Sequence, residues 1–269
     1  MHLSKEEQIQ YKHYCDLIRM ANQRNFPVYS QFASLNEREL AYTAMESYYG
    51  RKVAEGTGYL TYGGYEDAER RMICFFPENT YHVPVLEDFP LSCVIVSPAN
   101  KRYCDTLTHR DYLGTLMNLG IERDQIGDIL VKKEENAVHE LYHSYIFCKK
   151  DKVPLLLEIT RIKHTTVTVS EVLPQDFHWK PSFKEITGSI SSLRLDAVIA
   201  VITRQSRSRC ISLIQENQVY INGRLCTENA KKLKDGDILS VRGFGKYVLQ
   251  EPDSISRKGR YHITIKQYI

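Results

Sequence analysis

Residues 191–249 decide the fold of the C-terminal part of the chain, and they read SSLRLDAVIAVITRQSRSRCISLIQENQVYINGRLCTENAKKLKDGDILSVRGFGKYVL. Apolar residues recur at helical spacing in the first half of this stretch. In the second half they alternate with polar residues between turn signals. The pattern predicts two short helices followed by a unit rich in β-hairpins.

The first helix carries a single apolar stripe, and we expect Ser191 or Ser192 to be its N-cap. The second helix opens at Ser206 or Ser208. The residues expected to face a shared core are Leu195, Val198, Ile199 and Ile202 in the first helix and Cys210, Ile211 and Ile214 in the second.

Turn residues separate the elements expected in the rest of the stretch. Asn217 stands where the second helix must stop in a left-handed conformation, for which asparagine is the next-best residue after glycine. Asn222-Gly223 is a two-residue hairpin signal, and Asp235-Gly236 predicts a further reversal.

Basic side chains gather around these elements. From Phe183 to Ile269 the chain has fifteen Lys and Arg against eight Asp and Glu, a net charge of +7, which leaves −4 for the rest. A helix start favours anions, so arginines placed there oppose helix stability but suit phosphate binding. A solvated basic surface without a ligand is the alternative interpretation. One basic group is Arg204, Arg207 and Arg209, and a second, expected to flank it, is Lys231, Lys232, Lys234, Arg242 and Lys246.

Several motifs in this stretch recur in one known domain. They are R-L-D at 194–196, then S-R, then L-I-x-x-N-x-V-x-I-N-G at 213–223 and K-D-G-D-I-L-x-V-R-G at 234–243. In this order they resemble the S4 RNA-binding domain, which is shared by a small-subunit ribosomal protein, RNA-modifying enzymes and ribosome quality-control factors. The family usually has glycine at the position of Asn217. The resemblance implies RNA binding, which we expect of Arg194, Arg204, Arg207, Arg209, Lys231, Lys232, Lys234, Arg242 and Lys246.

Two upstream stretches carry a narrower resemblance. GGYEDAERR at 63–71 and THRDYLGTLMNLGIERDQIGDILV at 108–131 are similar to the N-terminal and central signatures of the YlmH family, an S4-domain group of Gram-positive bacteria. Membership implies structured RNA partners, ribosomal RNA or tRNA, on a large ribosomal subunit obstructed by peptidyl-tRNA. It also implies a role in ribosome-associated quality control, beside an older association with cell division.

Turn clusters and changes of periodicity divide the chain into parts. We expect an α+β protein with a mixed N-terminal domain at 1–76, a central domain at 77–178, a linker at 179–190, the S4 domain at 191–250 and a β extension at 251–269. A helix near the N-terminus should be capped by Ser34 or Asn36. Trp179, Pro181 and Gly188 indicate that the linker is a hinge.

The central domain reads β-α-β-β-α-β, the order of a ferredoxin-like or RRM-like sandwich. Expected strands span 91–97, 125–131, 137–142 and 164–172, and expected helices span 109–119 and 144–157, with Pro154 kinking or restarting the second helix. An RRM stacks bases on aromatic residues of its third strand, but AVHELYHS at 137–144 does not match that motif. The sequence therefore gives no support for RNA stacking on this sheet.

Composition excludes several classes of protein. Of 269 residues, 42% are apolar and 26% are charged, which is typical of a globular protein. No apolar run approaches the ~20 residues that span a bilayer, and the start lacks a signal-peptide pattern, so we expect a cytoplasmic protein without membrane contact. The seven cysteines are never closer than eleven residues, and Cys104 and His109 have no second pair of matching spacing. We therefore expect no bound metal. We also expect that the protein has no small-molecule cofactor and is a monomer.

An RNA-modifying enzyme, either a pseudouridine synthase or an RNA methyltransferase, is the alternative function. Pseudouridine synthases carry an R-L-D whose aspartate attacks the base, but here Asp196 opens the S4 helix itself and no second R-L-D occurs. We interpret Asp196 as a structural acid paired with an arginine. A methyltransferase needs a Gly-rich turn between a strand and a helix, and no G-x-G stands in that context. We predict an RNA-binding protein without catalytic residues; a pocket upstream of the linker that gathers acids would favour the enzyme.

Overall fold

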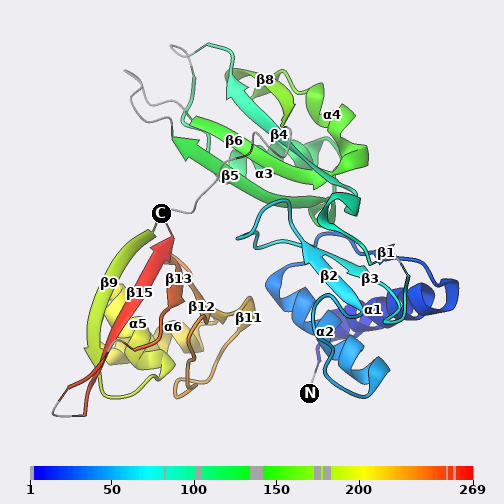
Figure 1. The fold of residues 1–269 in the computed structure, drawn as a ribbon. Helices are drawn as coiled ribbons and strands as arrows, with labels where there is room; N and C mark the ends of the chain where they lie inside the picture. The colour runs from blue at the N-terminus through cyan, green and yellow to red at the C-terminus, as the bar shows by residue number, and fades with distance from the viewer. Residues whose placement is uncertain are drawn as a thin grey trace. The chain divides into compact units, whose positions relative to one another are not determined.

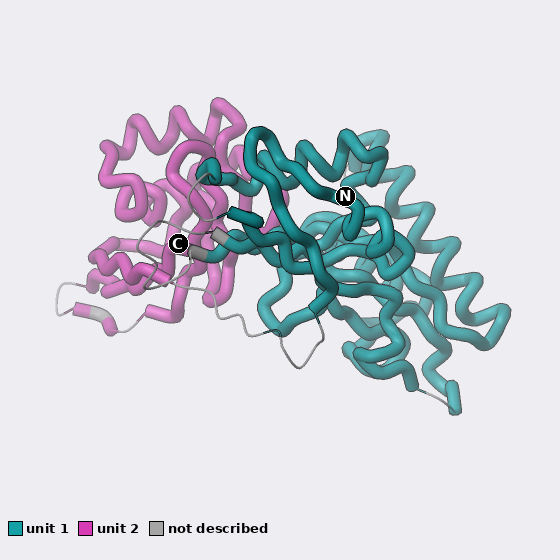
Figure 2. Tube along the Cα trace, turned by 90° about the horizontal axis from the view of Figure 1, so that it is seen from above, with its two compact units in different colours: residues 1–179 teal, residues 180–269 magenta. Residues whose placement is uncertain are grey.

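The structure, a computed structural model, describes residues 3–81, 83–100, 104–133, 142–172, 177, 183–252, 254–256 and 259–268. The chain divides into two compact units, residues 1–179 and residues 180–269, which Figure 2 shows in different colours. Two sheets belong to the first unit and one sheet belongs to the second. The stretches expected to form separate N-terminal and central domains therefore share one compact unit. Each unit mixes helices and sheet and is described by itself.

Two helices pack with a three-stranded antiparallel sheet in the N-terminal part of the first unit. The elements in chain order are α1 (Lys5–Arg24), β1 (Val28–Tyr29), α2 (Leu35–Tyr49), β2 (Tyr59–Tyr62) and β3 (Met72–Phe75). Each helix begins with a capping box, Ser4 with Glu7 and Ser34 with Glu37. Ser34, rather than Asn36, is therefore the cap of α2.

The second sheet of this unit has five antiparallel strands in the order β5-β6-β4-β8-β7. Its elements in chain order are η1 (Leu86–Asp88), β4 (Leu91–Pro98), α3 (His109–Asn118), η2 (Arg123–Gln125), β5 (Ile126–Lys133), β6 (Tyr142–Lys149), η3 (Lys150–Lys152), α4 (Val153–Leu157), β7 (Arg161–Ile162) and β8 (Thr165–Val172). Apart from the short β7, this is the predicted β-α-β-β-α-β order.

The helix expected at 144–157 is wrong over its first half. Residues 144–149 continue β6, and the helical part consists of the 3-10 turn η3 followed by α4. Ile146 is buried on the helix side of β6 and Phe147 is buried on the other side. A strand buried on both faces has a continuous apolar run, which resembles a buried helix in sequence. Pro154 lies in the first turn of α4, where a missing N–H is tolerated. The strand expected at 137–142 falls, except for Tyr142, outside the described residues.

Hydrogen bonds join the two sheets of the first unit. Asp128 Oδ2 accepts from the Tyr65 hydroxyl and from the N–H of Glu69, both at 2.7 Å, and Oδ1 accepts from the N–H of Arg70 at 3.0 Å. The Arg70 guanidinium donates to the carbonyl oxygen of Ile126 at 3.0 Å. These bonds connect the stretches 63–71 and 108–131, so both stretches have a structural role.

The second unit has one antiparallel sheet with two helices on one of its faces (Figure 1). Its elements are β9 (Phe183–Ile190), α5 (Leu195–Thr203), α6 (Arg207–Gln215), β10 (Val219–Ile221), β11 (Arg224–Leu225), β12 (Ile238–Val241), β13 (Gly245–Leu249), β14 (Ser254–Ile255) and β15 (Tyr261–Tyr268). The strand order is β11-β10-β12-β13-β15-β14, and β9 also pairs with β15. The expected core residues of both helices are buried, except Ile211, which is half-buried.

The linker expected at 179–190 is wrong from Phe183 onward. Strand β9 pairs with β15 along its whole length, from Phe183 opposite Tyr268 to Ile190 opposite Tyr261. The partner strand lies near the C-terminus, so this pairing has no local sequence signal. Trp179 and Pro181, which indicated a hinge, lie outside the described residues.

Local turn signals in the second unit are confirmed, with one exception. Asn217 has φ +58°, and Asn222 and Gly223 have φ +50° and +79° in the turn between β10 and β11. Ser206 caps α6. The exception is α5, which begins after Arg194 instead of being capped by Ser191 or Ser192.

Candidate nucleic-acid interface

Helix α6 starts among arginines, as the sequence predicts. Ser206 Oγ accepts the N–H of Arg209 at 3.3 Å, and no acidic side chain occupies the first turn. Arg207 and Arg209 lie in that turn, and Arg204 ends α5 with φ +55°. All three arginines are exposed. The helix start and the guanidinium groups together offer an anion N–H donors and positive charge.

A buried carboxylate organises this end of the unit. Asp196 is 2% exposed, and its Oδ1 accepts from the N–H of Ala197 at 3.0 Å. Arg194 Nε lies 3.1 Å from Oδ1, and Arg207 Nη1 lies 3.9 Å from Oδ2. A buried charge needs such partners, so Asp196 has the structural role expected of it. Both arginine side chains remain about half exposed and keep donors for a ligand.

The loop before β12 adds lysines to this site. The N–H of Leu195 donates to the carbonyl of Lys231 at 2.9 Å, and Arg194 forms a β-bridge with Lys232. Lys231 and Lys232 are exposed. Two residues of the second expected basic group thus lie beside Arg194. We call the resulting set the helix-side surface, formed by Arg194, Arg204, Arg207, Arg209, Lys231 and Lys232.

Arg242 and Lys246 do not join the helix-side surface. Arg242 Nη2 donates to the Tyr220 hydroxyl at 3.0 Å, and Lys246 Nζ lies 4.7 Å from the centroid of the Tyr268 ring. These side chains lie on the sheet face opposite the helices, because their strand neighbours Val241 and Tyr247 are buried in the helix-side core. The expectation that Arg242 and Lys246 flank the α6 arginines is therefore wrong. Lys234 opens a turn, where Asp237 Oδ2 accepts its N–H at 2.8 Å.

Sequence reasoning missed one arginine near this site. Arg260 Nε donates to Ser189 Oγ at 3.0 Å, and Arg260 and Arg207 both line a groove of about 480 Å³ beside α5. Ser191 also lines the groove. The run R-K-G-R at 257–260 was the available signal, but it falls in the segment interpreted only as a β extension.

One aromatic residue of the central sheet, Phe147, lies in the core of the first unit. The third strand of this sheet is β6, and Phe147 on that strand is 1% exposed. Phe147 stacks on Tyr65 with ring centroids 5.2 Å apart and also contacts Phe177. Because these rings cover Phe147 within the first unit, RNA bases cannot stack on it.

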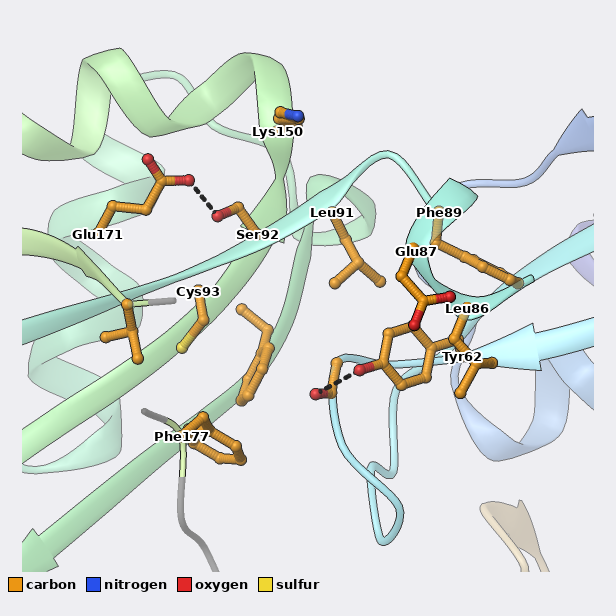
Figure 3. Close-up of a pocket in the computed structure, with 13 residues that line it drawn as sticks. Tyr62, Leu86, Glu87, Phe89, Leu91, Ser92, Cys93, Lys150, Glu171 and Phe177 are labelled. Atoms are coloured by element: carbon orange, nitrogen blue, oxygen red, sulfur yellow. Dashed lines mark hydrogen bonds between the residues drawn. The ribbon is translucent and has the colours of Figure 1, made fainter. Parts of the chain in front are cut away.

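A pocket of about 320 Å³ in the first unit tests the enzymatic alternative (Figure 3). Glu171 accepts a hydrogen bond from the Ser92 hydroxyl, while Glu87 lies on the opposite side of the pocket, near Tyr62. Burial raises the pKa of the Cys93 thiol far above its usual value, which keeps this group protonated and unreactive. The lining also includes Lys150, and within it the Glu171 carboxylate is held by the Ser92 hydroxyl.

Two further properties concern the described residues as a whole. Within the described ranges, no three His, Cys, Asp or Glu side chains come together as metal ligands. No helix in that part of the chain is both long and apolar enough to cross a membrane.

Comparison with known proteins adds independent findings. Residues 193–239 match the family model of the S4 domain, and residues 84–176 match the model of the RNA-binding domain in YlmH. The Bacillus subtilis ribosome-associated protein quality control protein P2 is 31% identical over 210 residues, 76% of this chain and 76% of that protein. The solved structure of cell division protein ylmH from Streptococcus pneumoniae is similar with a TM-score of 0.49 and 24% identity, over 64% of this chain and 94% of that one.

The S4 match and the basic surface beside its helices define the chain as an S4-domain RNA-binding protein. Its sequence identity with the Bacillus subtilis relative, and the share of both chains that is aligned, are high enough to assign the family. The chain belongs to the YlmH family, and the resemblance drawn from its motifs is confirmed.

Proposed function

We propose that this chain binds structured RNA, either ribosomal RNA or tRNA, on a large ribosomal subunit obstructed by peptidyl-tRNA, and so acts in ribosome-associated quality control. The name of the Bacillus subtilis relative supports the quality-control role. The observation that carries RNA binding is the helix-side surface, where Arg194 and Arg207 converge on the buried Asp196 and Lys232 lies beside Arg194.

This geometry suits the phosphate backbone of a folded RNA. Asp196 restrains two guanidinium groups, so less side-chain freedom is lost when they bind phosphate. A-form RNA hides its base edges in a deep, narrow groove, so contact is chiefly to phosphates and to shape. The protein acts in this proposal by binding rather than by catalysis.

Two charges of the helix-side surface can be removed without touching Asp196. We expect Arg204→Gln with Arg209→Gln to reduce affinity for large ribosomal subunits and to lower the slope of log K against log salt by about two, because each lost phosphate contact releases one counterion fewer. Stability should hold or rise slightly, since glutamine is a good helix former at position 209 and the ion pair of Arg209 with Glu216, at 3.4 Å, is exposed. Binding of labelled protein across a salt series measures both quantities.

The matched control removes two exposed charges from α1, by Lys12→Gln with Arg19→Gln. Its salt slope should equal that of the parent protein. Equal slopes for the α6 variant and the parent would contradict the helix-side surface as the RNA site. Arg207→Gln is kept separate, because it also weakens the ion pair with buried Asp196.

A second prediction concerns catalysis. Nucleosides of tRNA and ribosomal RNA from a deletion strain should match those of the parent strain, because the protein acts in this proposal by binding RNA and not by modifying it. Mass spectrometry of the digested RNA makes the comparison. One missing modification that the protein restores would establish the RNA-modifying enzyme instead.

A further inference from the structure

The sheet of the second unit carries an ordered row of side chains on the face opposite its helices. In the strand register Tyr220 lies opposite Leu225 on one side and Ser240 on the other, Ser240 lies opposite Lys246, and Tyr268 lies opposite Phe183. Lys246 Nζ reaches the Tyr268 ring and closes the row. We call this the open-face row. From β10 to β9 it crosses four strand spacings, roughly 19 Å.

Each aromatic ring of the row has a cation beside it. The Arg242 guanidinium carbon lies 5.6 Å from the centroid of the Tyr220 ring, and Lys246 Nζ lies 4.7 Å from that of Tyr268. Lys266 Nζ lies 5.8 Å from the centroid of the Phe183 ring, which itself packs edge-on against Tyr268 at 4.9 Å. The row therefore interleaves π-faces with positive charge.

This arrangement is not required by the core. The core-side neighbours Val219, Leu239 and Tyr247 are buried with the helices, whereas Phe183 is 37% exposed and Tyr220 and Tyr268 are half-buried. Cation–π pairs at such sites contribute little to folding. Glu185 lies on the same face, opposite Lys266. Net positive charge thus concentrates toward Arg242 and Lys246.

We propose that the open-face row is a second RNA-binding surface, which takes a single-stranded segment by stacking its unpaired bases on Tyr220, Tyr268 and Phe183. This proposal rests on the proposed function, because both require that the chain binds RNA. The surface differs from the helix-side surface, and the RNA that it binds is single-stranded. Aromatic platforms with basic side chains are the general means of holding single strands, since every base has a π-face. Of these residues only Tyr220 lies within the stretch 193–239 that matches the S4 model.

The lysines and the arginine of the row have different roles in this mechanism. The ammonium groups of Lys246 and Lys266 lie near the rings, and their flexible stems let them move to phosphates when a base stacks on the ring face. The planar Arg242 guanidinium instead extends the stacking surface of Tyr220. The helix-side surface offers fixed donors but no comparable row of rings.

The test uses the full chain and two fluorescein-labelled probes, an oligouridylate of about ten nucleotides and an RNA duplex of about sixteen base pairs. Tyr220→Ala with Tyr268→Ala should weaken oligouridylate binding by about tenfold or more, because two stacking platforms are lost. Duplex binding should stay within about twofold. Tyr220→Phe with Tyr268→Phe keeps both rings and should retain oligouridylate binding. Fluorescence anisotropy reports both affinities.

Thr187→Ala with His262→Ala is the matched control, since both side chains lie on the same sheet face, away from the row. It should bind both probes like the parent. Arg204→Gln with Arg209→Gln should weaken duplex binding and spare oligouridylate. If that variant binds the duplex normally, the proposed function fails while the open-face row can still stand.

Three results would overturn the open-face row. They are no binding of oligouridylate by the parent protein, equal binding by the alanine variant, and equally tight binding of polyglutamate of the same length, which would indicate an acidic protein segment as the partner. If the alanine variant does not fold, Lys246→Gln with Lys266→Gln replaces it. That variant should lower the oligouridylate salt slope by about two, and an unchanged slope would also overturn the proposal.

Discussion

The five-stranded sheet of the first unit and the sheet of the second unit are both antiparallel, and both bury one face against helices. Their other faces differ. Phe147 on the five-stranded sheet is 1% exposed beneath Tyr65, whereas Phe183 on the sheet of the second unit is 37% exposed. An aromatic residue on a strand is therefore part of the core where another layer of the protein covers it. Where no such layer covers it, its ring is available to a ligand.

A glycine turn forms part of the layer that covers Phe147. Gly64 has φ +99°, and a Cβ built there would lie 2.2 Å from the Phe147 ring. The turn can approach the ring this closely because glycine has no side chain. In the second unit the turn between β12 and β13 contains Gly243, also with positive φ, but no described atom lies within 4 Å of its Cβ position.

The largest effect should separate the two phenylalanines. We expect Phe147→Ala to reduce the free energy of unfolding of the first unit by about 3–5 kcal/mol, because it opens a cavity in a closed layer. Phe183→Ala should reduce that of the second unit by less than about 1 kcal/mol. Urea unfolding followed by circular dichroism measures both losses. Losses of similar size would break the comparison, since both faces would then be core.

A smaller effect should separate the two glycines. Gly64→Ala and Gly243→Ala both place a side chain at positive φ, which costs about 1 kcal/mol at each site. Only Gly64→Ala also collides with a ring, which adds about 1–3 kcal/mol. Thermal unfolding of both variants should therefore show the larger decrease in Tm for Gly64→Ala. Equal decreases would mean that the turn does not press on Phe147.

The smallest effect concerns acid stability and should belong to the first unit. Hydrogen bonds from Lys163, whose Nζ lies 2.6 Å from Asp111 Oδ1, and from Thr108 lower the pKa of Asp111 from 3.8 to about 2. Because the folded pKa is depressed, its contribution to stability is present above pH 3.8 and is lost as the pH falls toward about 2.

Lys163→Gln should therefore flatten the decrease in stability between pH 4 and pH 2, measured by thermal unfolding. Lys152→Gln is the control, because Lys152 lies 3.8 Å from the mostly exposed Asp151. The control should keep the slope of the parent protein. A slope that Lys163→Gln leaves unchanged would remove this ion pair from the acid response.

Features of the fold that close within a few residues could be predicted from the sequence. Ser206 caps α6 and Asn217 ends it in the left-handed region because each depends only on its own turn. The strand β9 could not be predicted, because its hydrogen bonds go to β15 near the C-terminus. The sequence predicts a helix over residues 144–149 because burial on both faces of the strand removes the period of two.

The sequence by itself determined the family, the S4 stretch and the concentration of positive charge near the C-terminus, since motifs and charges are properties of the chain order. Only the tertiary structure decided which of those charges act together. Lys232 joins Arg194 through a bridge between distant segments, and Arg242 lies on the other face of the sheet with Tyr220. The physical reason is that successive residues of a strand point to opposite faces, and the register of the partner strands determines which side chains become neighbours.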